Sequence, residues 1–221
     1  MCRPVVYVVD DDDVSRRAIG SLLSATGVSV QSFPSASAFL ARLPTDSLGC
    51  VITDVRMPGT SGIELVRRLR EIDPDLPVVV VSGFIDVADT VKAMKLGAVT
   101  VLTKPFEASQ LREAIDLSFT LLKERRAKSS RRTALSTLFA QLTKGEWKVL
   151  QCLDMGLPNK VTASRLGVSP RTVEDRRRRI MEKLSADNVA ALVHLLNEAR
   201  ALRVSLQLPD RPTDDGPTPT S

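Results

Sequence analysis

Four short apolar runs of the sequence each end in polar residues whose types suit phosphate chemistry. The endings are Asp10 and Asp11 after residues 5–9, Asp54 after 50–53, Ser82 after 78–81 and Lys104 after 99–103. A carboxylate can act as a nucleophile or bind a hard cation, whereas a hydroxyl and an ammonium can hold phosphoryl oxygens. In an open parallel sheet, ligands bind outside the carboxyl ends of the strands. The sequence therefore predicts that these side chains converge on one site.

The elements that carry these residues alternate between strand and helix. Strands are predicted over residues 5–9, 28–33, 50–53, 78–81 and 99–103. Five helices are predicted between and after them: one that ends at Gly27, one over 35–43, one that begins at Ser61, one over 86–96 and one that begins near Glu107. Five strands rich in β-branched residues, each followed by a helix, predict an α/β fold with a doubly wound five-stranded parallel sheet.

The run of four aspartates from Asp10 to Asp13 has two interpretations. Aspartate in the first turn of a helix accepts from free N–H groups and suits the helix dipole, which accounts for Asp12 or Asp13. Capping does not account for Asp10 and Asp11, whose charges repel each other unless a cation lies between them. With Asp54 elsewhere in the chain, we favour metal binding for this pair.

The composition is that of a folded protein. A chain of 221 residues with 43% hydrophobic residues can form one large or two small domains with real cores. No apolar run approaches the roughly 20 residues that cross a bilayer, and no signal-peptide core is present, so a cytoplasmic location is expected. The widely spaced Cys2, Cys50 and Cys152 and the single His194 lack metal-ligand spacing, and we expect them to be structural or incidental.

Charge is distributed unevenly along the chain. Residues 1–122 carry a net charge of −3, residues 123–200 carry +9 and residues 201–221 carry −1, which together give the +5 of the whole chain. An acidic first half joined to a basic second half predicts two domains with different partners, and the partner of the second is a polyanion.

About the first 120 residues resemble the receiver domain of response regulators, which has a flavodoxin-like fold. The resemblance rests on Asp10-Asp11, the loop Asp54-Val-Arg-Met-Pro-Gly, Ser82 and Lys104-Pro105-Phe106. It implies that Asp54 accepts a phosphoryl group from the phosphohistidine of a sensor histidine kinase. It also implies that Lys104 pairs with one phosphoryl oxygen, that Ser82 donates to another, and that the Lys104–Pro105 peptide is cis.

The same resemblance implies a divalent cation, Mg²⁺ or Mn²⁺, at this site. Asp11 and Asp54 would bind it directly, Asp10 through water, and Arg56 through its backbone carbonyl. Such hard oxygen ligands suit this ion, which would neutralise charge on the phosphoryl oxygens. No enzyme activity is expected beyond self-phosphorylation and self-dephosphorylation at Asp54.

An enzymatic alternative is a phosphatase or dehalogenase of the haloacid dehalogenase type. That fold also places a nucleophilic aspartate after a strand, but it requires a second aspartate two positions further on. Here that position is Arg56, which argues against this alternative.

The residue Val101 departs from the receiver pattern. In receivers the residue three positions before the lysine is often aromatic, and its ring swings inward on phosphorylation. A valine side chain is too small to signal phosphorylation by such a movement. We therefore hypothesise that activation depends more on movement of the loop over residues 82–86 and of the helix that follows it.

A basic segment and a second apolar helical pattern follow the receiver. Residues 123–134 predict a solvated linker or a helical extension, residues 135–200 a second domain, and residues 201–221 a disordered tail dominated by Pro, Thr, Asp and Gly. In the second domain, Thr143 and Glu146 predict a capping box at a helix start. Trp147 is expected on the core face of that helix rather than in a ligand site.

Two helices joined by a turn at Gly167 match a helix-turn-helix. One begins at Asn159, and the next is capped by Ser169-Pro170, with proline at a favourable first position. Residues 142–200 resemble the DNA-binding domain of the NarL, FixJ and LuxR group, so the whole chain resembles a FixJ-type response regulator. The matching residues are Leu142-Thr143, Glu146, Val149-Leu150, Gly156, Asn159-Lys160, Leu166-Gly167-Val168-Ser169, Thr172-Val173, Ile180-Met181 and Lys183-Leu184.

This resemblance implies a DNA-binding surface on the second helix of the motif. Glu174, Asp175 and Arg178 would face base edges, while Arg171, Thr172, Arg177 and Lys183 would contact the DNA backbone. The group usually has an uncharged residue in place of Asp175 and a histidine in place of Arg176. Acidic side chains repel phosphates but accept from the cytosine amino group, so either an unusual operator or weak binding is expected.

The helix expected over residues 188–200 resembles the dimerisation helix of the group. The implied protein is a transcriptional response regulator in which phosphorylation at Asp54 controls homodimerisation and binding to double-stranded DNA, with RNA polymerase as a further partner. The competing interpretation is a phosphate-regulated protein-interaction module with weak or no DNA binding. Glu174 and Asp175 favour that interpretation, and the +9 charge of residues 123–200 opposes it.

Overall fold

The computed structural model describes residues 5–24, 27–43, 48–83 and 87–204. The chain divides into two compact units, Met1–Ala127 and Lys128–Ser221. Helix α5, Ala108–Phe139, contributes residues to the hydrophobic cores of both units. Across the described ranges, none of the helices combines the length and the apolar character that crossing a membrane requires.

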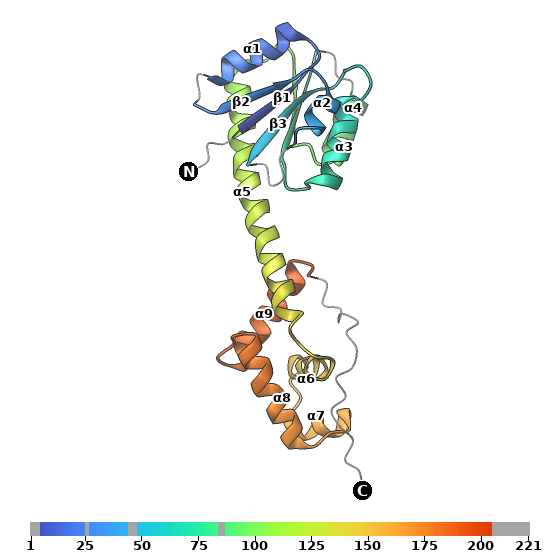
Figure 1. The fold of residues 1–221 in the computed structure, drawn as a ribbon, viewed down its shortest axis with the longest axis vertical. Coiled ribbons are helices and arrows are strands. Elements are labelled where there is room, and N and C mark those ends of the chain that lie inside the picture. Colours follow the sequence, from blue (N-terminus) through green and yellow to red (C-terminus); the bar gives the residue numbers. More distant parts are fainter. Residues whose placement is uncertain (1–4, 25–26, 44–47, 84–86, 205–221) are drawn as a thin grey trace. The chain divides into compact units, whose positions relative to one another are not determined.

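The first unit is a parallel sheet with helices on both faces (Figure 1). Its strands are β1 Val5–Val9, β2 Ser29–Phe33, β3 Gly49–Asp54, β4 Val78–Ser82 and β5 Thr100–Thr103, in the spatial order β2-β1-β3-β4-β5. Its helices before α5 are α1 Asp13–Ser24, α2 Ala36–Leu40, α3 Gly62–Ile72 and α4 Val87–Lys95. All neighbouring strands are parallel, which confirms the predicted doubly wound five-stranded sheet.

Two separate cores cover the two faces of this sheet. Ile19 of α1 and Leu111 of α5 pack with one set of strand side chains. Phe39 of α2 and Leu65 of α3 pack with the other set, and the partly buried Val101 lies against this second core. Every residue of β3 and β4 is buried, which explains why these strands read as continuous apolar runs rather than as alternating ones.

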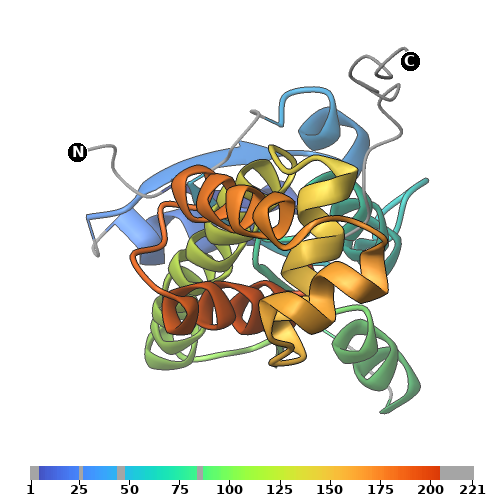
Figure 2. The same ribbon diagram turned by 90° about the horizontal axis from the view of Figure 1, so that it is seen from below.

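The second unit consists of helices that follow α5. They are α6 Lys144–Asp154, α7 Asn159–Leu166, α8 Pro170–Lys183 and α9 Val189–Ala201. In Figures 1 and 2 these helices, coloured from yellow to red, form one group. Helices α7 and α8 are joined through Gly167, whose φ of 65° lies in the left-handed region that glycine adopts without strain. This arrangement confirms the predicted helix-turn-helix.

Local signals set the starts of these helices as expected. The Thr143 side chain accepts from the Glu146 N–H while the Glu146 carboxylate accepts from the Thr143 N–H, which is the predicted capping box. Ser169 accepts from the Thr172 N–H and caps α8. Trp147 packs edge-on against Phe139 with ring centroids 6.0 Å apart, so its core role is confirmed.

Helix α9 uses part of its apolar surface within its own unit. Leu192 and Leu196 are buried in the core, while Val189 is exposed and Val193 is half-buried. A role of α9 in dimerisation stays a prediction, and any such contact must rely on the residues that remain accessible.

The segment between the predicted domains is part of α5. This helix has 32 residues and contains all of residues 123–134, so both predicted edges of the linker fall inside one helix. Arg126 is fixed to the first unit by Asp73 at 2.5 Å, and Arg131 is fixed to Glu198 of α9 at 2.6 Å. The domain boundaries stay predictions, and residues 205–221 of the predicted tail lie outside the described residues.

Among the residues that the structure describes, no cysteine or histidine belongs to a group of side chains that could hold a metal ion. Cys50 and Cys152 are buried and free, and burial raises the pKa of the Cys50 thiol to about 12, so this thiol stays protonated. His194 is exposed on α9, and Cys2 lies outside the described residues.

Candidate functional site

The register of the sheet places the predicted site residues side by side. Val9 pairs with Thr53, so Asp10 and Asp54 leave adjacent strands at the same level. Ser82 pairs with Thr103, so Ser82 lies beside the residue before Lys104. Parallel strands end at a common edge, and this edge therefore collects two carboxylates, a hydroxyl and an ammonium.

Lys104 joins the two buried carboxylates at this edge. Its Nζ lies 2.8 Å from Asp10 Oδ2 and 2.7 Å from Asp54 Oδ1. Asp10 is 1% exposed and Asp54 is 8% exposed. Burial lowers the pKa of Lys104, but the bonds and charges of the two carboxylates outweigh it, so the pKa lies above its usual value. One ammonium cannot balance two carboxylates, and the centre of the site keeps a net negative charge.

Neighbouring groups hold both carboxylates in place. Asp10 Oδ1 accepts from the Asp12 N–H at 2.9 Å, and Asp10 Oδ2 accepts from the Ser15 hydroxyl at 2.7 Å. Asp54 Oδ2 accepts from the Arg56 N–H at 2.6 Å. Sequence reasoning did not find Ser15. Its position five residues after Asp10, in the first turns of the next helix, was the available signal.

Gly62 brings the start of α3 directly against the end of β3. Its N–H donates to the Val55 carbonyl at 3.0 Å, and a Cβ at this position would lie 2.0 Å from the Asp54 carbonyl oxygen. No side chain fits there, because real Cβ atoms do not approach backbone atoms that closely. Gly62 therefore fixes the backbone that carries Asp54.

The remaining predicted site residues differ in exposure. Ser82 is buried at 1% exposure, the Arg56 side chain is exposed, and the cis peptide expected between Lys104 and Pro105 is confirmed. Asp11 is exposed, and the structure does not bring its carboxylate into a cluster with those of Asp10 and Asp54. Of the hypothesised activation loop, residues 84–86 lie outside the described residues.

The chemistry of the donor set fits Mg²⁺. Among the described residues, no group of three His, Cys, Asp or Glu side chains is arranged as a closed metal cage. Mg²⁺ rarely uses such a cage, since it keeps several waters and takes only one or two carboxylates. Asp10 and Asp54 supply two fixed carboxylates with excess negative charge, which is a suitable set of oxygens for this ion.

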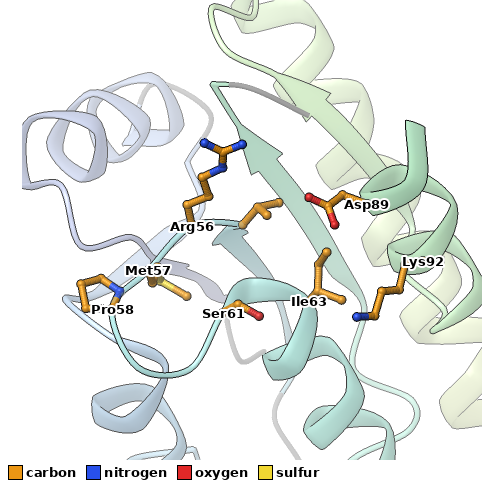
Figure 3. A pocket seen from close by; sticks show the side chains of 8 residues that line it. Arg56, Met57, Pro58, Ser61, Ile63, Asp89 and Lys92 are labelled. Carbon is orange, nitrogen blue, oxygen red and sulfur yellow. The ribbon is translucent and has the colours of Figure 1, made fainter. Parts of the chain in front are cut away.

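A pocket of about 540 Å³ opens next to this site (Figure 3). It is lined by Val55, Arg56, Met57, Pro58, Ser61, Ile63, Asp89 and Lys92. The first residues of this set directly follow Asp54, and the last two come from α4. The pocket therefore borders the loop after the aspartate and leaves the carboxylate itself outside its lining.

Helix α8 of the second unit presents a mixed, strongly charged outer face. Val173 and Ile180 are buried, while the exposed residues recur at helical spacing on the opposite side. The charged residues among them are Arg171, Glu174, Asp175, Arg178, Arg179 and Glu182. Four of the seven residues predicted to contact DNA are in this exposed set, and Arg179 joins them although sequence reasoning did not single it out.

The other predicted contact residues have partners within the unit. Arg177 donates to Asn159 Oδ1 at 2.5 Å. Lys183 donates to Glu146 Oε2 at 2.7 Å and to the Gln141 carbonyl at 3.1 Å. Thr172 is half-buried, and its hydroxyl lies 2.8 Å from that of Ser169. Arg177 and Lys183 thus join α8 to neighbouring segments, whereas Thr172 bonds to the cap of its own helix. Contact with DNA stays a prediction for all three.

The two units together define a two-part regulator, with a phosphoacceptor-type α/β domain followed by a helix-turn-helix domain. Residues 6–116 match the family model described as response regulator receiver domain, and residues 140–196 match that of bacterial regulatory proteins, luxR family. The chain therefore belongs to the response regulators with a LuxR-type DNA-binding domain, a family of transcription regulators.

Relatives share this organisation along the chain. The transcriptional regulatory protein FixJ of Azorhizobium caulinodans is 40% identical over 216 residues, which cover 97% of each protein. The response regulator protein TodT of Pseudomonas putida is 38% identical and covers 86% of this chain and 84% of its own. Among solved structures, the response regulator StyR matches with a TM-score of 0.78 and 41% identity over 89% of this chain and 100% of its own. Full-length FixJ from B. japonicum matches with a TM-score of 0.56 and 37% identity over 91% and 99%.

Proposed function

We propose that Asp54 is the phosphoacceptor through which a sensor histidine kinase controls DNA binding by the second domain. The observation that carries this proposal is the position of Lys104, whose ammonium lies within 2.8 Å of both Asp10 and Asp54 at the carboxyl edge of the sheet. A buried carboxylate that is fixed by a backbone N–H and has a cation beside it is prepared to receive a phosphoryl group.

The proposed step is transfer of a phosphoryl group to Asp54. A carboxylate oxygen of Asp54 attacks phosphorus, the bond to the histidine nitrogen of the kinase breaks, and an acyl phosphate forms. Lys104 then moves its pairing from the carboxylate to a phosphoryl oxygen, and Ser82 donates to another. Attack of water on the acyl phosphate releases inorganic phosphate and returns the free carboxylate, so self-phosphorylation and self-dephosphorylation are the only chemistry proposed for the chain.

A divalent ion completes this site in the proposal. Mg²⁺ or Mn²⁺ would be held by Asp54 and Asp11, by Asp10 through water, and by the Arg56 carbonyl. When bound, it neutralises charge on the phosphoryl oxygens. The excess negative charge of Asp10 and Asp54 supports this assignment, and Asp11 would have to turn toward them from its exposed position.

We propose that the phosphorylated chain forms a homodimer that binds double-stranded DNA. This dimer then acts on RNA polymerase. The net charge of +9 over residues 123–200 and the exposed arginines of α8 support DNA as the partner. We propose the cytoplasm as the location of this action, in keeping with a DNA partner.

The phosphoacceptor assignment is tested with labelled phosphoryl donor and the variant Asp54→Asn. The unchanged chain should form an acid-stable, base-labile acyl phosphate, and the variant should form none. Labelled acyl phosphate that persists on the variant would refute Asp54 as the acceptor.

The coupling to DNA is tested by measuring affinity for promoter fragments with and without beryllofluoride, a phosphoryl mimic, at equal salt. Tighter, salt-dependent binding with the mimic is expected. Equal affinities would show that phosphorylation does not control DNA binding. Absence of any binding would favour a phosphate-regulated protein-interaction module instead.

A further inference from the structure

The four consecutive arginines of α8, Arg176 to Arg179, lie in different surroundings. Arg177 is tied to Asn159, and Arg178 Nη2 lies 3.7 Å from Asp175 Oδ1. Arg178 and Arg179 are exposed, whereas Arg176 is half-buried on the flank of α8. Within the described ranges, no hydrogen bond or ion pair holds the Arg176 guanidinium. Its five N–H donors are thus directed neither to a carboxylate nor to a carbonyl of the described chain.

A glycine on the neighbouring helix leaves the space that the Arg176 guanidinium occupies. A Cβ on Gly145, in the first turn of α6, would lie 2.8 Å from Arg176 Cζ, 3.0 Å from Nη2 and 3.1 Å from Nη1. The guanidinium therefore occupies space that any other residue at position 145 would fill. Glycine has a lower helix propensity than alanine, so helix formation alone does not explain its presence in α6.

The flank of a recognition helix is where DNA phosphates run. In a helix-turn-helix complex, the second helix lies in the major groove and the residues at its sides contact the sugar-phosphate backbone. Arg176 stands between the buried stripe of Val173 and Ile180 and the exposed face of α8. The exposed Lys144 precedes Gly145 and adds a second cation at the start of α6.

We propose that Arg176 contacts a DNA phosphate and that Gly145 is a positioning residue, because its missing side chain leaves the space that the Arg176 guanidinium occupies for that contact. The proposal rests on DNA binding as the proposed function. A guanidinium packed against the backbone of α6 has fewer conformations to lose when it binds, which favours Arg176 as a phosphate ligand.

The variant Gly145→Ala separates this role from a role in folding. The added methyl group meets only the flexible end of an arginine, so it should move the guanidinium aside while the backbone stays in place. Alanine also favours helix, so the thermal unfolding midpoint should stay equal or rise. Gly20→Ala in α1 is the matched control, because a Cβ on Gly20 meets nothing within 4 Å.

The experiment uses the full chain with beryllofluoride and a duplex selected by the unchanged chain from a random-sequence library. Gly145→Ala is expected to weaken binding roughly tenfold and to reduce the slope of log affinity against log salt by about one. Arg176→Met should give the same loss, and the double variant should lose no more than either single variant. Gly20→Ala should bind as the unchanged chain does.

Unchanged affinity and salt slope in Gly145→Ala, or additive losses in the double variant, would overturn the role of Gly145 in placing Arg176. If Arg176→Met also binds with full affinity, the phosphate contact itself is overturned. If the unchanged chain binds no duplex at any salt concentration, the proposed function fails together with this proposal.

Discussion

At the phosphoacceptor site, a single ammonium is shared by two buried carboxylates. Lys104 lies close to both Asp10 and Asp54, and both carboxylates accept further N–H or O–H donors. The free protein therefore holds its acceptor in place before any phosphoryl donor arrives. The remaining negative charge lowers the stability of the fold but favours binding of a cation. Functional sites often lose stability in this way.

The variant Lys104→Met should lower the free energy of unfolding of the first unit by about 1–3 kcal/mol in the absence of divalent ions, since two buried carboxylates lose their cation. Added Mg²⁺ should restore more stability to the variant than to the unchanged chain. Urea unfolding followed by circular dichroism measures this difference. The exposed Lys95→Met serves as control, and an equal effect of both substitutions would contradict the account.

The variant Asp175→Ala should broaden the DNA sequence preference. Asp175 is exposed on the outer face of α8, where a carboxylate can accept from the cytosine amino group and repels phosphates elsewhere. Selection from an operator library before and after the substitution measures the change. The same preference in both proteins would count against a base contact by Asp175.

At the scale of elements, the capping box of α6 is joined to the end of α8. Glu146, which is 2% exposed, accepts from the Thr143 N–H and from Lys183. Burial raises the pKa of Glu146, but these hydrogen bonds outweigh it and hold the pKa below its ordinary value of 4.5. One carboxylate thus fixes both the start of α6 and the end of the helix proposed to contact DNA.

Acidification should therefore destabilise the second unit. A carboxyl group with a lowered pKa in the folded state stabilises the fold above its unfolded pKa and loses this contribution as pH falls through the folded value. The unfolding midpoint, followed by fluorescence of the single Trp147, should drop as pH falls below about 4.5. In Glu146→Gln the midpoint should be lower at neutral pH and should change less on acidification. The same change of unfolding midpoint with pH in both proteins would contradict a contribution of Glu146 to this pH dependence.

Sequence patterns predicted most elements of both units, for reasons visible in the structure. Buried parallel strands give continuous apolar runs, and side-chain caps such as Ser169 act within one turn of the helix they start. The partners of Arg177 and Lys183 could not be predicted in this way. Asn159 and Glu146 are 18 and 37 residues away from them, and only tertiary packing brings these atoms together.

The linker illustrates a second limit. The basic segment 123–134 was open to two interpretations, because its Lys, Arg and Ser residues suit both a solvated coil and an exposed helix. In the structure it continues α5, with Arg126 and Arg131 each joined to an acidic partner. Charge composition alone does not distinguish these two states.

At the scale of the whole molecule, one helix belongs to both the receiver and the DNA-binding unit. Leu111 and Ile115 of α5 pack against the sheet, and Leu135 and Phe139 of the same helix pack in the second core. Because both sets of residues belong to one continuous helix, we expect the coupling between phosphorylation and DNA binding to depend on an intact α5.

The variant Ser129→Pro tests this path, because proline in a helix interior removes a hydrogen bond and costs about 3 kcal/mol. Acyl phosphate formation at Asp54 should remain as in the unchanged chain. The ratio of DNA affinities with and without beryllofluoride should fall toward one. Ser129→Ala should keep the full ratio, and a full ratio in the proline variant would show that coupling does not depend on an intact α5.

The contact between Gly62 and the end of β3 has a consequence for genetics. A mutation screen for loss of signalling would ordinarily interpret a hit in α3 as a folding defect or as a lost protein contact. Since any side chain at position 62 would collide with the Asp54 carbonyl, substitutions there should have the phenotype of an acceptor mutant while the acceptor codon is intact. Alleles at codon 62 and codon 54 should accordingly fall into one phenotypic class.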